Sequence, residues 1–505
     1  MAYLVGIDLG STSLKAVVYR PDGTAVASAS RPTERFHPSA EHPDWTVWQP
    51  EQIWGGTAEA LREAVSQLDD PNAVAAVAVT GMGMDGLPIA DDGTWLYPFI
   101  SWLDPRTTPQ LDWWVEHVGQ ARTYAIGGNP LWAINSALRI RWMLDHEPAI
   151  LDQADKWLLI EDFVNFMLCG ERATDYSMAS CTMLFDQTTL DWSPELLTAA
   201  GIRPDLMPAA HPAGTRLGTV HRRAAEATGL PVGTPVVLGG HDHLCGALPV
   251  GAFAPGVVLD VTGTWEIVST PVHQPVLTEA ARAAGLTMQA HVARGCHGAW
   301  ASTVAAESLE WFRAQASDTD DWGELMARAS AAPAGSGGTL FLPHVAGCTC
   351  PVIDAKAMGV FAGLRASTGR GELVRAVIEG LDYQFREILG AVETILGSRA
   401  ERIVAVGGAV RNVFWMQNKA DVTGATVEVP AVEEATPLGA AMLAGIGVGL
   451  YADEADAYAQ VGRPGVTYEP DAALAEVYAQ GFARYQRLYP ALAELHHEIA
   501  DGILL

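Results

Sequence analysis

The stretch VVLGGHDHLCGA, residues 236 to 247, concentrates chemically active side chains. His241, His243 and Cys245 are ligand types that zinc prefers, and they surround one carboxylate, Asp242. An aspartate can instead act as a general base that takes the proton of an alcohol during group transfer. A zinc centre would need a fourth ligand. The chain offers His344, Cys348 and Cys350 for it.

The segment DLGSTSLK, residues 8 to 15, has the composition of a phosphate-binding turn. Small residues with free backbone N–H groups, together with hydroxyl side chains, form cradles for phosphate oxygens. Asp8 can hold Mg²⁺ through water, because this ion keeps most of its hydration shell, and Lys15 adds a positive charge. The predicted cradle consists of Gly10, Ser11, Thr12 and Ser13.

Two later segments have related chemistry. DVTGTWE, residues 260 to 266, repeats the acidic residue and the Gly/Thr turn, with Gly263 and Thr264 in the cradle positions. Two such turns facing each other would clamp one polyphosphate. In residues 404 to 424 a glycine pair, Gly407 and Gly408, lets the backbone approach a flat ring or a ribose closely, unless it serves only strand–helix packing.

Residues 81 to 86, GMGMDG, fit the dinucleotide-binding pattern G-x-G-x-x-G. That pattern requires a helix next, but Pro88 and an Asp-Asp-Gly turn follow, which favours a hairpin. We therefore reject a dinucleotide-binding site at this loop. Asp85 either binds substrate hydroxyls or caps the turn.

The surrounding elements are predicted from apolar periodicity. Residues 3–8 and 15–20 are expected to form a hairpin, 51–66 a helix, 73–81 a buried strand and 107–170 mostly helices. Residues 257–270 repeat the strand–turn–strand pattern of the N-terminus, which suggests two related halves. The predicted domains are 1–250 and 251–505. Residues 470–505 are predicted to form one amphipathic helix, with a stripe of Leu474, Tyr478, Phe482 and Tyr485.

Composition limits the class of protein. A chain of 505 residues with 49% hydrophobic and 18% charged residues predicts a soluble protein of two large domains. A net charge of −28 argues against a nucleic-acid partner, because phosphate backbones are bound by clustered Lys and Arg. Six scattered cysteines favour reduced thiols, and no segment is typical of a signal peptide or a membrane span. We expect a cytoplasmic protein without a membrane partner, and leave a homodimer open.

These motifs, in this order, resemble those of the FGGY carbohydrate kinases, within the actin-like ATPase superfamily. The resemblance covers nearly the whole chain and includes GVFAGLRASTGRGELVRAVIE at 359–379, WLDPR at 102–106 and ERATDYSMAS at 171–180. In SALRIRWMLDH, 136–146, Arg139 stands where the family usually has Lys. The resemblance implies an α/β fold of two ribonuclease-H-like domains, a catalytic cleft between them, and ATP with Mg²⁺.

The resemblance also implies roles for the candidate residues. Asp242 would be the general base, Asp8 would organise Mg²⁺ through water, and Lys15 would meet the charge of the transferred phosphate. The two turns would hold the ATP phosphates. The adenosine moiety would contact Gly407, Gly408 and Asn412. The substrate would contact Met84, Asp85, Trp102, Asp104, His241 and Asp242.

The implied substrate is a small sugar, with a ketopentose such as xylulose as the leading expectation. The chain departs from xylulose kinases, which show Met-His where it reads TGMGMDG, and from glycerol kinases, which have G-D-Q around the base. A linear polyol, a tetrose derivative or a sugar acid stays an alternative, although Arg106 is the one cation near 81–106, which weighs against an acid. A regulator that binds nucleotide without catalysis is the alternative from another class, and the presence of Asp242 argues against it.

Overall fold

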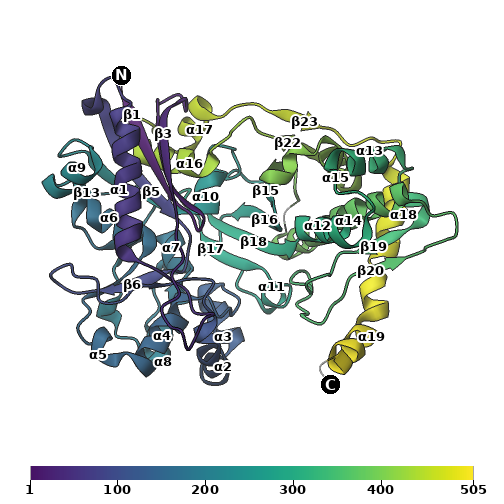
Figure 1. The fold of residues 1–505 in the computed structure, drawn as a ribbon, viewed down its shortest axis with the longest axis horizontal. Coiled ribbons are helices and arrows are strands. Elements are labelled where there is room, and N and C mark those ends of the chain that lie inside the picture. The colour runs from purple at the N-terminus through teal and green to yellow at the C-terminus, as the bar shows by residue number, and fades with distance from the viewer. Residues whose placement is uncertain (1, 398, 504–505) are drawn as a thin grey trace.

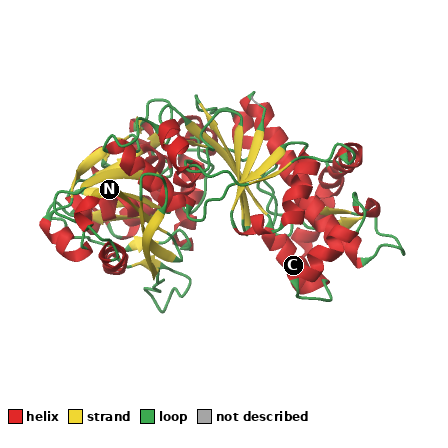
Figure 2. Ribbon diagram, turned by 90° about the horizontal axis from the view of Figure 1, so that it is seen from above, coloured by secondary structure: helices red, strands yellow, loops and turns green. Residues whose placement is uncertain are grey.

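The computed structural model describes residues 2–397 and 399–503, which form an α/β protein of two lobes. Each lobe is built around one mixed β-sheet, and the two sheets are separated by helices and loops (Figure 2). Chain order runs from the purple lobe on the left to the green lobe on the right, but the late helices α16 (Ala435–Gly447) and α17 (Glu454–Val461) return to the first lobe (Figure 1).

The first sheet has the strand order β13-β14-β5-β1-β2-β3. The predicted hairpin and the predicted buried strand at 73–81 are confirmed: β1 pairs antiparallel with β2 and parallel with β5, and β14 runs parallel to β5. The strands are β1 (Tyr3–Leu9), β2 (Ser13–Tyr19), β3 (Ala25–Pro32), β5 (Val74–Gly81), β13 (Arg216–Thr219) and β14 (Pro235–His241).

The second sheet repeats this topology. The order β3-β2-β1-β5-β14 of the first sheet corresponds to β18-β16-β15-β21-β22 in the second, with the same alternation of antiparallel and parallel pairs. The expected strand–turn–strand at 257–270 is thus confirmed. The strands are β15 (Val257–Thr262), β16 (Trp265–Val272), β17 (Thr287–Ala290), β18 (His297–Val304), β21 (Arg402–Val406), β22 (Thr426–Val429) and β23 (Val466–Tyr468).

Short strand pairs complete the lobes. They are β4 (Val47–Trp48) with β7 (Phe99–Ile100), β6 (Gly86–Ile89) with β8 (Lys156–Leu159), β9 (Ala173–Asp175) with β12 (Ala209–His211), β10 (Phe185–Asp186) with β11 (Asp191–Trp192), and β19 (Leu340–Leu342) with β20 (Val360–Ala362). The β6 strand and its following turn form the hairpin expected after residue 86, not a helix.

The helices surround these sheets, and the helix expected at 51–66 is confirmed as α1. In the first half they are α1 (Pro50–Ser66), α2 (Thr108–His117), α3 (Gln120–Gly127), α4 (Ser136–His146), α5 (Pro148–Leu151), α6 (Ile160–Cys169), α7 (Tyr176–Ser180), α8 (Pro194–Ala200), α9 (Arg222–Thr228) and α10 (Asp242–Ala247). In the second half, besides α16 and α17, they are α11 (Glu279–Ala283), α12 (Ala306–Ala316), α13 (Trp322–Ala331), α14 (Arg370–Leu396), α15 (Val413–Thr423), α18 (Ala475–Tyr485) and α19 (Leu488–Ile503).

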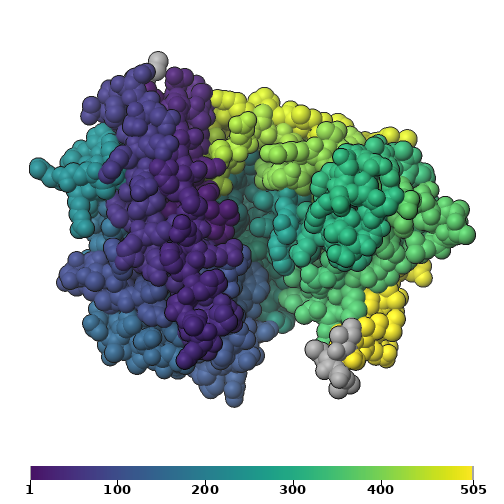
Figure 3. All heavy atoms as spheres, viewed as in Figure 1, coloured from purple at the N-terminus to yellow at the C-terminus, as the bar shows by residue number. Residues whose placement is uncertain are grey.

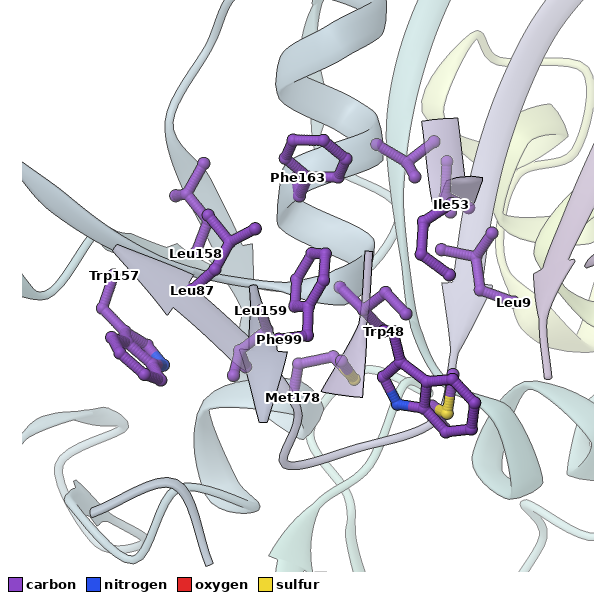
Figure 4. Close-up of a cluster of buried hydrophobic side chains, with 14 of the residues drawn as sticks. Leu9, Trp48, Ile53, Leu87, Phe99, Trp157, Leu158, Leu159, Phe163 and Met178 are labelled. Atoms are coloured by element: carbon purple, nitrogen blue, oxygen red, sulfur yellow. The ribbon is translucent and has the colours of Figure 1, made fainter. Parts of the chain in front are cut away.

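Each sheet carries its own hydrophobic core. In the first lobe, Trp48, Phe99, Phe163 and Leu9 belong to one hydrophobic cluster and are completely buried (Figure 4). A buried aliphatic or aromatic side chain of this kind stabilises the fold by about 1.5–3 kcal/mol. This core fixes β1, which carries Asp8 near its end, and the short strand β4, which carries Trp48.

Helix α16 connects the two halves. It packs on β1, β5 and β14, and Leu438 and Leu443 join the core of the first lobe. The approach to α10 is so close that a Cβ on Gly439 would lie 1.8 Å from the carbonyl oxygen of Cys245, so only glycine fits there. A boundary near residue 250 stays a prediction, and α16 returns from beyond it to the first sheet.

The prediction of a single helix over 470–505 is wrong. The structure has two helices, α18 and α19, which are separated at Gln486 and Arg487. Pro490 explains the break, because its ring would clash with the carbonyl of Gln486 in a continuous helix but is tolerated in the first turn of α19. In the described part of the chain, no helix combines the length and apolar character needed to cross a membrane.

Candidate active site

The candidate residues gather where parallel strands of the first sheet end. The strands β1, β5 and β14 run in the same direction, so their carboxyl ends share one edge, which is where open α/β sheets bind ligands. Asp8 lies near the end of β1, and Asp242 follows directly after β14. Figure 3 shows a furrow between the two lobes, with teal atoms at its floor, the colour of the chain region that includes β14, α10 and β15.

Asp242 is the first residue of α10, directly after β14 ends at His241. Its Oδ1 accepts the backbone N–H of His243 at 2.5 Å. His241 Nε2 and His243 Nδ1 each lie 3.6 Å from the same oxygen. The two imidazoles therefore flank one side of the carboxylate.

The electrostatics keep Asp242 ionised. Burial favours its neutral form, but the hydrogen bonding from His243 and the two adjacent imidazoles outweigh it, so the pKa of Asp242 lies below its ordinary value. Burial lowers the pKa of His241 to about 4, so this imidazole is neutral at pH 7. The arrangement is an ionised carboxylate beside a neutral histidine, as a general base requires.

The zinc interpretation lacks a fourth ligand. Within residues 2–397 and 399–503, the group able to hold a metal consists of His241, Asp242 and His243 alone. The Nδ1 atom of His241 lies 3.4 Å from Cys181 Sγ. The other proposed ligands are engaged elsewhere: His344 packs on Tyr489, and Cys348 Sγ bonds the carbonyl of Cys350.

Asp8 and Lys15 occupy the same edge. Burial, with the nearby charge of Asp242, raises the pKa of Asp8 to about 7. Lys15 Nζ binds both carboxylate oxygens of Glu434 at 2.9 Å, so a residue just before α16 neutralises the lysine in this arrangement. Glu434 was not predicted, and nothing in its local sequence pointed to it.

Each of the two glycine turns is closed by the backbone N–H of its glycine. In the first, Gly10 N–H donates to the carbonyl of Ser13 at 3.1 Å, and Thr12 is exposed between them while Ser11 is half-buried. In the second, Gly263 N–H donates to the carbonyl of Trp265 at 2.9 Å, with Thr264 exposed. Both turns leave their tips open to a ligand.

A cavity of about 1080 Å³ opens beside the second turn. Its lining includes Gly263, Thr264, Leu309, Met326, Gly408 and Asn412. Asn412 caps α15 by accepting the backbone N–H of Trp415 at 3.1 Å. Gly407 does not line the cavity: its φ is 102°, and a Cβ there would lie 2.5 Å from the carbonyl oxygen of Thr262. The two glycines thus have different tasks, although nothing in their local sequence distinguishes them.

Met84 and Asp85 belong to a buried polar cluster. Trp48 Nε1 donates to Asp85 Oδ2 at 2.7 Å, and a nitrogen of Arg139 lies 3.2 Å from Oδ1. Burial raises the pKa of Asp85 to about 6, against the opposing effect of Arg139. Met84 has a φ of 79°, rare for a side-chain-bearing residue, and its carbonyl is held by Ser136 Oγ and Arg139 at 2.6 and 2.8 Å.

Asp104 and Trp102 differ in whether their side chains are free to contact a substrate. The Asp104 carboxylate is completely buried, where it accepts the N–H of Thr46 at 2.6 Å and pairs with Arg106. Its Oδ1 accepts the backbone N–H and the Nε–H of Arg106, so both oxygens are used within the protein and neither is free for a substrate. Trp102 is half-buried and packs against the first core.

Two further candidate residues were missed in the sequence. Lys419 on α15 is completely buried and binds Asp260 and Glu266, on the two strands that lead into and out of the second turn. The side-chain amide nitrogen of Gln289, on β17, lies 2.9 Å from His243 Nε2. The only signal was the scarcity of lysine, since Lys419 is one of four in the chain. For Gln289 there was none, because a glutamine in a short strand has no distinctive pattern.

Comparison with known proteins places this geometry in a family. Residues 3–249 match the N-terminal domain, and residues 259–448 the C-terminal domain, of the FGGY family of carbohydrate kinases. The chain is 31% identical to L-fuculokinase of Escherichia coli over 90% of this chain and 94% of that protein, and 31% identical to xylulose kinase of Klebsiella pneumoniae over 97% and 99%.

The crystal structure of xylulose kinase from Rhodospirillum rubrum is similar to the whole fold, with a TM-score of 0.90, 30% identity, and coverage of 98% of this chain and 100% of that one. This similarity confirms the expected α/β fold of two domains of the actin-like ATPase type. The chain therefore belongs to the FGGY family of carbohydrate kinases, which are phosphotransferases.

Proposed function

We propose that this kinase transfers the γ-phosphoryl group of ATP to a hydroxyl of an uncharged ketose, with Asp242 as the general base. The observation that carries the proposal is the ionised Asp242 carboxylate at the carboxyl end of β14, on the strand edge that also bears Asp8. Phosphoryl transfer to an alcohol needs a carboxylate that orients the hydroxyl and takes its proton. The hydrogen bond of Asp242 goes to Oδ1, so Oδ2 is the oxygen that would receive the proton.

The ATP phosphates would lie between the two turns. Gly10, Ser11, Thr12 and Ser13 would bind them from the first lobe, and Gly263 and Thr264 from the second. Gly408 and Asn412 line the cavity that would hold adenosine. Closure of the lobes would exclude water, which otherwise competes with the sugar for the phosphoryl group.

Asp8 fits the expected magnesium site. Burial and neighbouring charges raise the pKa of its carboxyl group, which makes no hydrogen bond within the described residues. Carboxylate oxygen is the ligand type that Mg²⁺ uses. Bound there through water, the ion would neutralise phosphate charge. Lys15 would add a second positive charge once the phosphate competes with Glu434 for it.

The charge of the pocket supports a neutral substrate. A sugar acid needs a free cation, but Arg106 is paired with Asp104 and Arg139 with Asp85, and all four side chains are buried. Asp85, Met84, Trp102 and His241 stay our candidates for substrate contacts. Asp104 would act indirectly, by holding the segment that carries Trp102.

Two ketoses are the leading candidates. A ketopentose such as xylulose is favoured because the relative from K. pneumoniae is named xylulose kinase. The 6-deoxyketohexose fuculose is the second candidate, because the E. coli relative of equal identity is named L-fuculokinase. A cytoplasmic location and a homodimer stay predictions.

The test is ADP release from Mg·ATP across xylulose, ribulose, fuculose, erythrulose, glycerol and gluconate, with Asp242→Asn beside the parent. We expect one ketose to stimulate ADP release strongly and the variant to lose at least about 100-fold in kcat. Stimulation by gluconate would contradict the neutral pocket. If ATP binds but no sugar raises ADP release, the proposal fails, and a nucleotide-binding regulator becomes the better account.

A further inference from the structure

His243 joins the candidate base to the second sheet. Its backbone N–H bonds Asp242 Oδ1 at 2.5 Å, and its Nδ1 lies 3.6 Å from the same oxygen. Its other nitrogen, Nε2, lies 2.9 Å from the side-chain amide nitrogen of Gln289 on β17. The imidazole thus stands between a carboxylate of the first half and an amide of the second half.

The contact with Gln289 determines which ring nitrogen carries the proton. An amide nitrogen only donates, so His243 Nε2 must accept and the proton must sit on Nδ1. That N–H then faces Asp242. The opposite tautomer would set two N–H groups against each other and turn a bare lone pair toward the carboxylate. Gln289 is 1% exposed, so water does not replace its amide.

The ring is also fixed sterically. His241 packs edge-on against it with centroids 4.4 Å apart, and Trp300 does so from β18 at 5.7 Å. The His243 side chain is 11% exposed, which leaves it little freedom to rotate. A ring held on three sides and bonded at Nε2 presents its Nδ1–H in one direction.

Gln289 itself is anchored to the first half. On one side of it, Met288 N–H donates to the carbonyl of Gly128 at 2.8 Å. On the other side, Ala290 N–H donates to Ser180 Oγ at 3.1 Å. Although β17 belongs to the second sheet, bonds to the first half flank Gln289, so its distance from Asp242 is fixed by backbone contacts.

We propose that Gln289, acting through the Nδ1–H tautomer of His243, positions the carboxylate of Asp242 so that Oδ1 is held by protein and Oδ2 faces the substrate hydroxyl. This inference rests on the proposed role of Asp242 as the base. Gln289 and His243 are positioning residues, because neither needs to touch the reacting atoms. A histidine after the base and a glutamine on β17 would then form one functional unit.

The first readout does not depend on activity. In ¹⁵N-histidine-labelled protein, the His243 resonances are assigned by their loss in His243→Leu. We expect Nδ1 protonated and Nε2 unprotonated in the parent. In Gln289→Glu an acceptor replaces the donor, so Nε2 becomes protonated. A parent with Nε2 protonated at neutral pH would overturn the inference, whatever the enzyme phosphorylates.

The second readout is kinetic, on the sugar found to be the substrate. Gln289→Leu and His243→Leu should each lower kcat about 10- to 100-fold, because a misdirected base loses the geometry of attack, while the KM for ATP stays the same. The double variant should be no slower than His243→Leu, since the two residues act in series. The controls are Gln480→Leu, and His273→Leu at an exposed histidine.

The outcomes separate the two proposals. A parent that phosphorylates no sugar refutes the proposed function, and the tautomer measurement still decides the hydrogen bond. An active parent with unchanged kcat in Gln289→Leu, or with losses that add in the double variant, refutes the positioning role alone. If Gln289→Leu fails to fold, Gln289→Glu and the parent spectrum give the answer.

Discussion

Lys419 Nζ lies 2.6 Å from Glu266 Oε1, and both side chains are almost completely buried. The lysine also binds Asp260, and its ammonium lies 4.4 Å from the ring centroid of Phe385. Asp260 and Glu266 lie on the two strands joined by the second turn, whereas Lys419 lies on α15, which begins at the cavity beside that turn. The ion pair therefore fixes the predicted phosphate cradle relative to the predicted adenosine site.

Lys419→Met should destabilise the protein and weaken ATP binding. The change leaves two carboxylates buried without their cation, and removing one partner of such a pair costs about 3–5 kcal/mol. Urea denaturation measures the loss, and the KM for ATP should rise while the KM for the sugar stays the same. Lys356→Met is the control, because Lys356 forms an exposed pair with Asp501 of the same length, 2.6 Å, worth less than about 1 kcal/mol. Equal losses in the two variants would contradict the role of burial.

The adjacent glycines Gly407 and Gly408 should respond to substitution in different ways. Gly407→Ala forces a side chain into a positive φ and against Thr262, so we expect a loss of about 1–3 kcal/mol in stability. A Cβ on Gly408 meets no atom within 4 Å, so Gly408→Leu should fold normally but project into the cavity and raise the KM for ATP. Thermal unfolding and nucleotide titration distinguish the two effects. A nucleotide site elsewhere would leave ATP binding to Gly408→Leu unchanged.

Asp8 should make the stability of the magnesium-free protein depend on pH. Its pKa in the folded protein, about 7, lies above the ordinary value, so its contribution is fully present in acid and is lost as the pH rises through 7. Asp8→Asn stays neutral, and should therefore match the parent near pH 4 and exceed its stability at pH 8. Urea denaturation at several pH values measures this difference, with the exposed Asp69→Asn as control. A difference that does not change with pH would rule out the raised pKa.

Mg²⁺ should offset the stability that the protein loses when Asp8 ionises. Since the ion binds the ionised carboxylate, its stabilisation of the parent should increase as the pH rises through 7 and should be absent in Asp8→Asn. Thermal unfolding with and without Mg²⁺ in the presence of ADP tests this. Equal stabilisation of the parent and of Asp8→Asn would show that Mg²⁺ does not bind at Asp8.

The sequence predicts well what is local. The turn at 8–15, its repeat at 260–266 and the candidate base after β14 could all be found, because strand–turn–strand patterns and an aspartate at a strand end involve consecutive residues. Asp104 shows the limit: its type and motif suggested a substrate contact, but burial pairs it with Arg106. Gln289 and Lys419 act through partners 46 and 153 residues away in sequence, and only the folded chain shows those pairs.

Arg139, which stands where the family usually has lysine, provides the last prediction. Its guanidinium donates to the Met84 carbonyl at 2.8 Å and faces Asp85 at 3.2 Å, so one planar group holds both a strained backbone and a buried carboxylate. Arg139→Lys offers a single ammonium that cannot make both contacts in the same geometry. We expect a loss of about 1–3 kcal/mol in stability, the cost of a buried group left unpaired, and a higher KM for the sugar with an unchanged KM for ATP.

The control for this change is on the same helix. Arg141 also belongs to α4, but it is partly exposed and pairs with Asp145 at 2.5 Å, so Arg141→Lys should change stability by less than about 0.5 kcal/mol and leave both KM values alone. Urea denaturation and steady-state kinetics on the identified sugar compare the two variants. If Arg139→Lys behaves like Arg141→Lys, the loop of Met84 and Asp85 keeps its shape without the guanidinium, and the substrate pocket must be fixed by Trp48 and Ser136 instead.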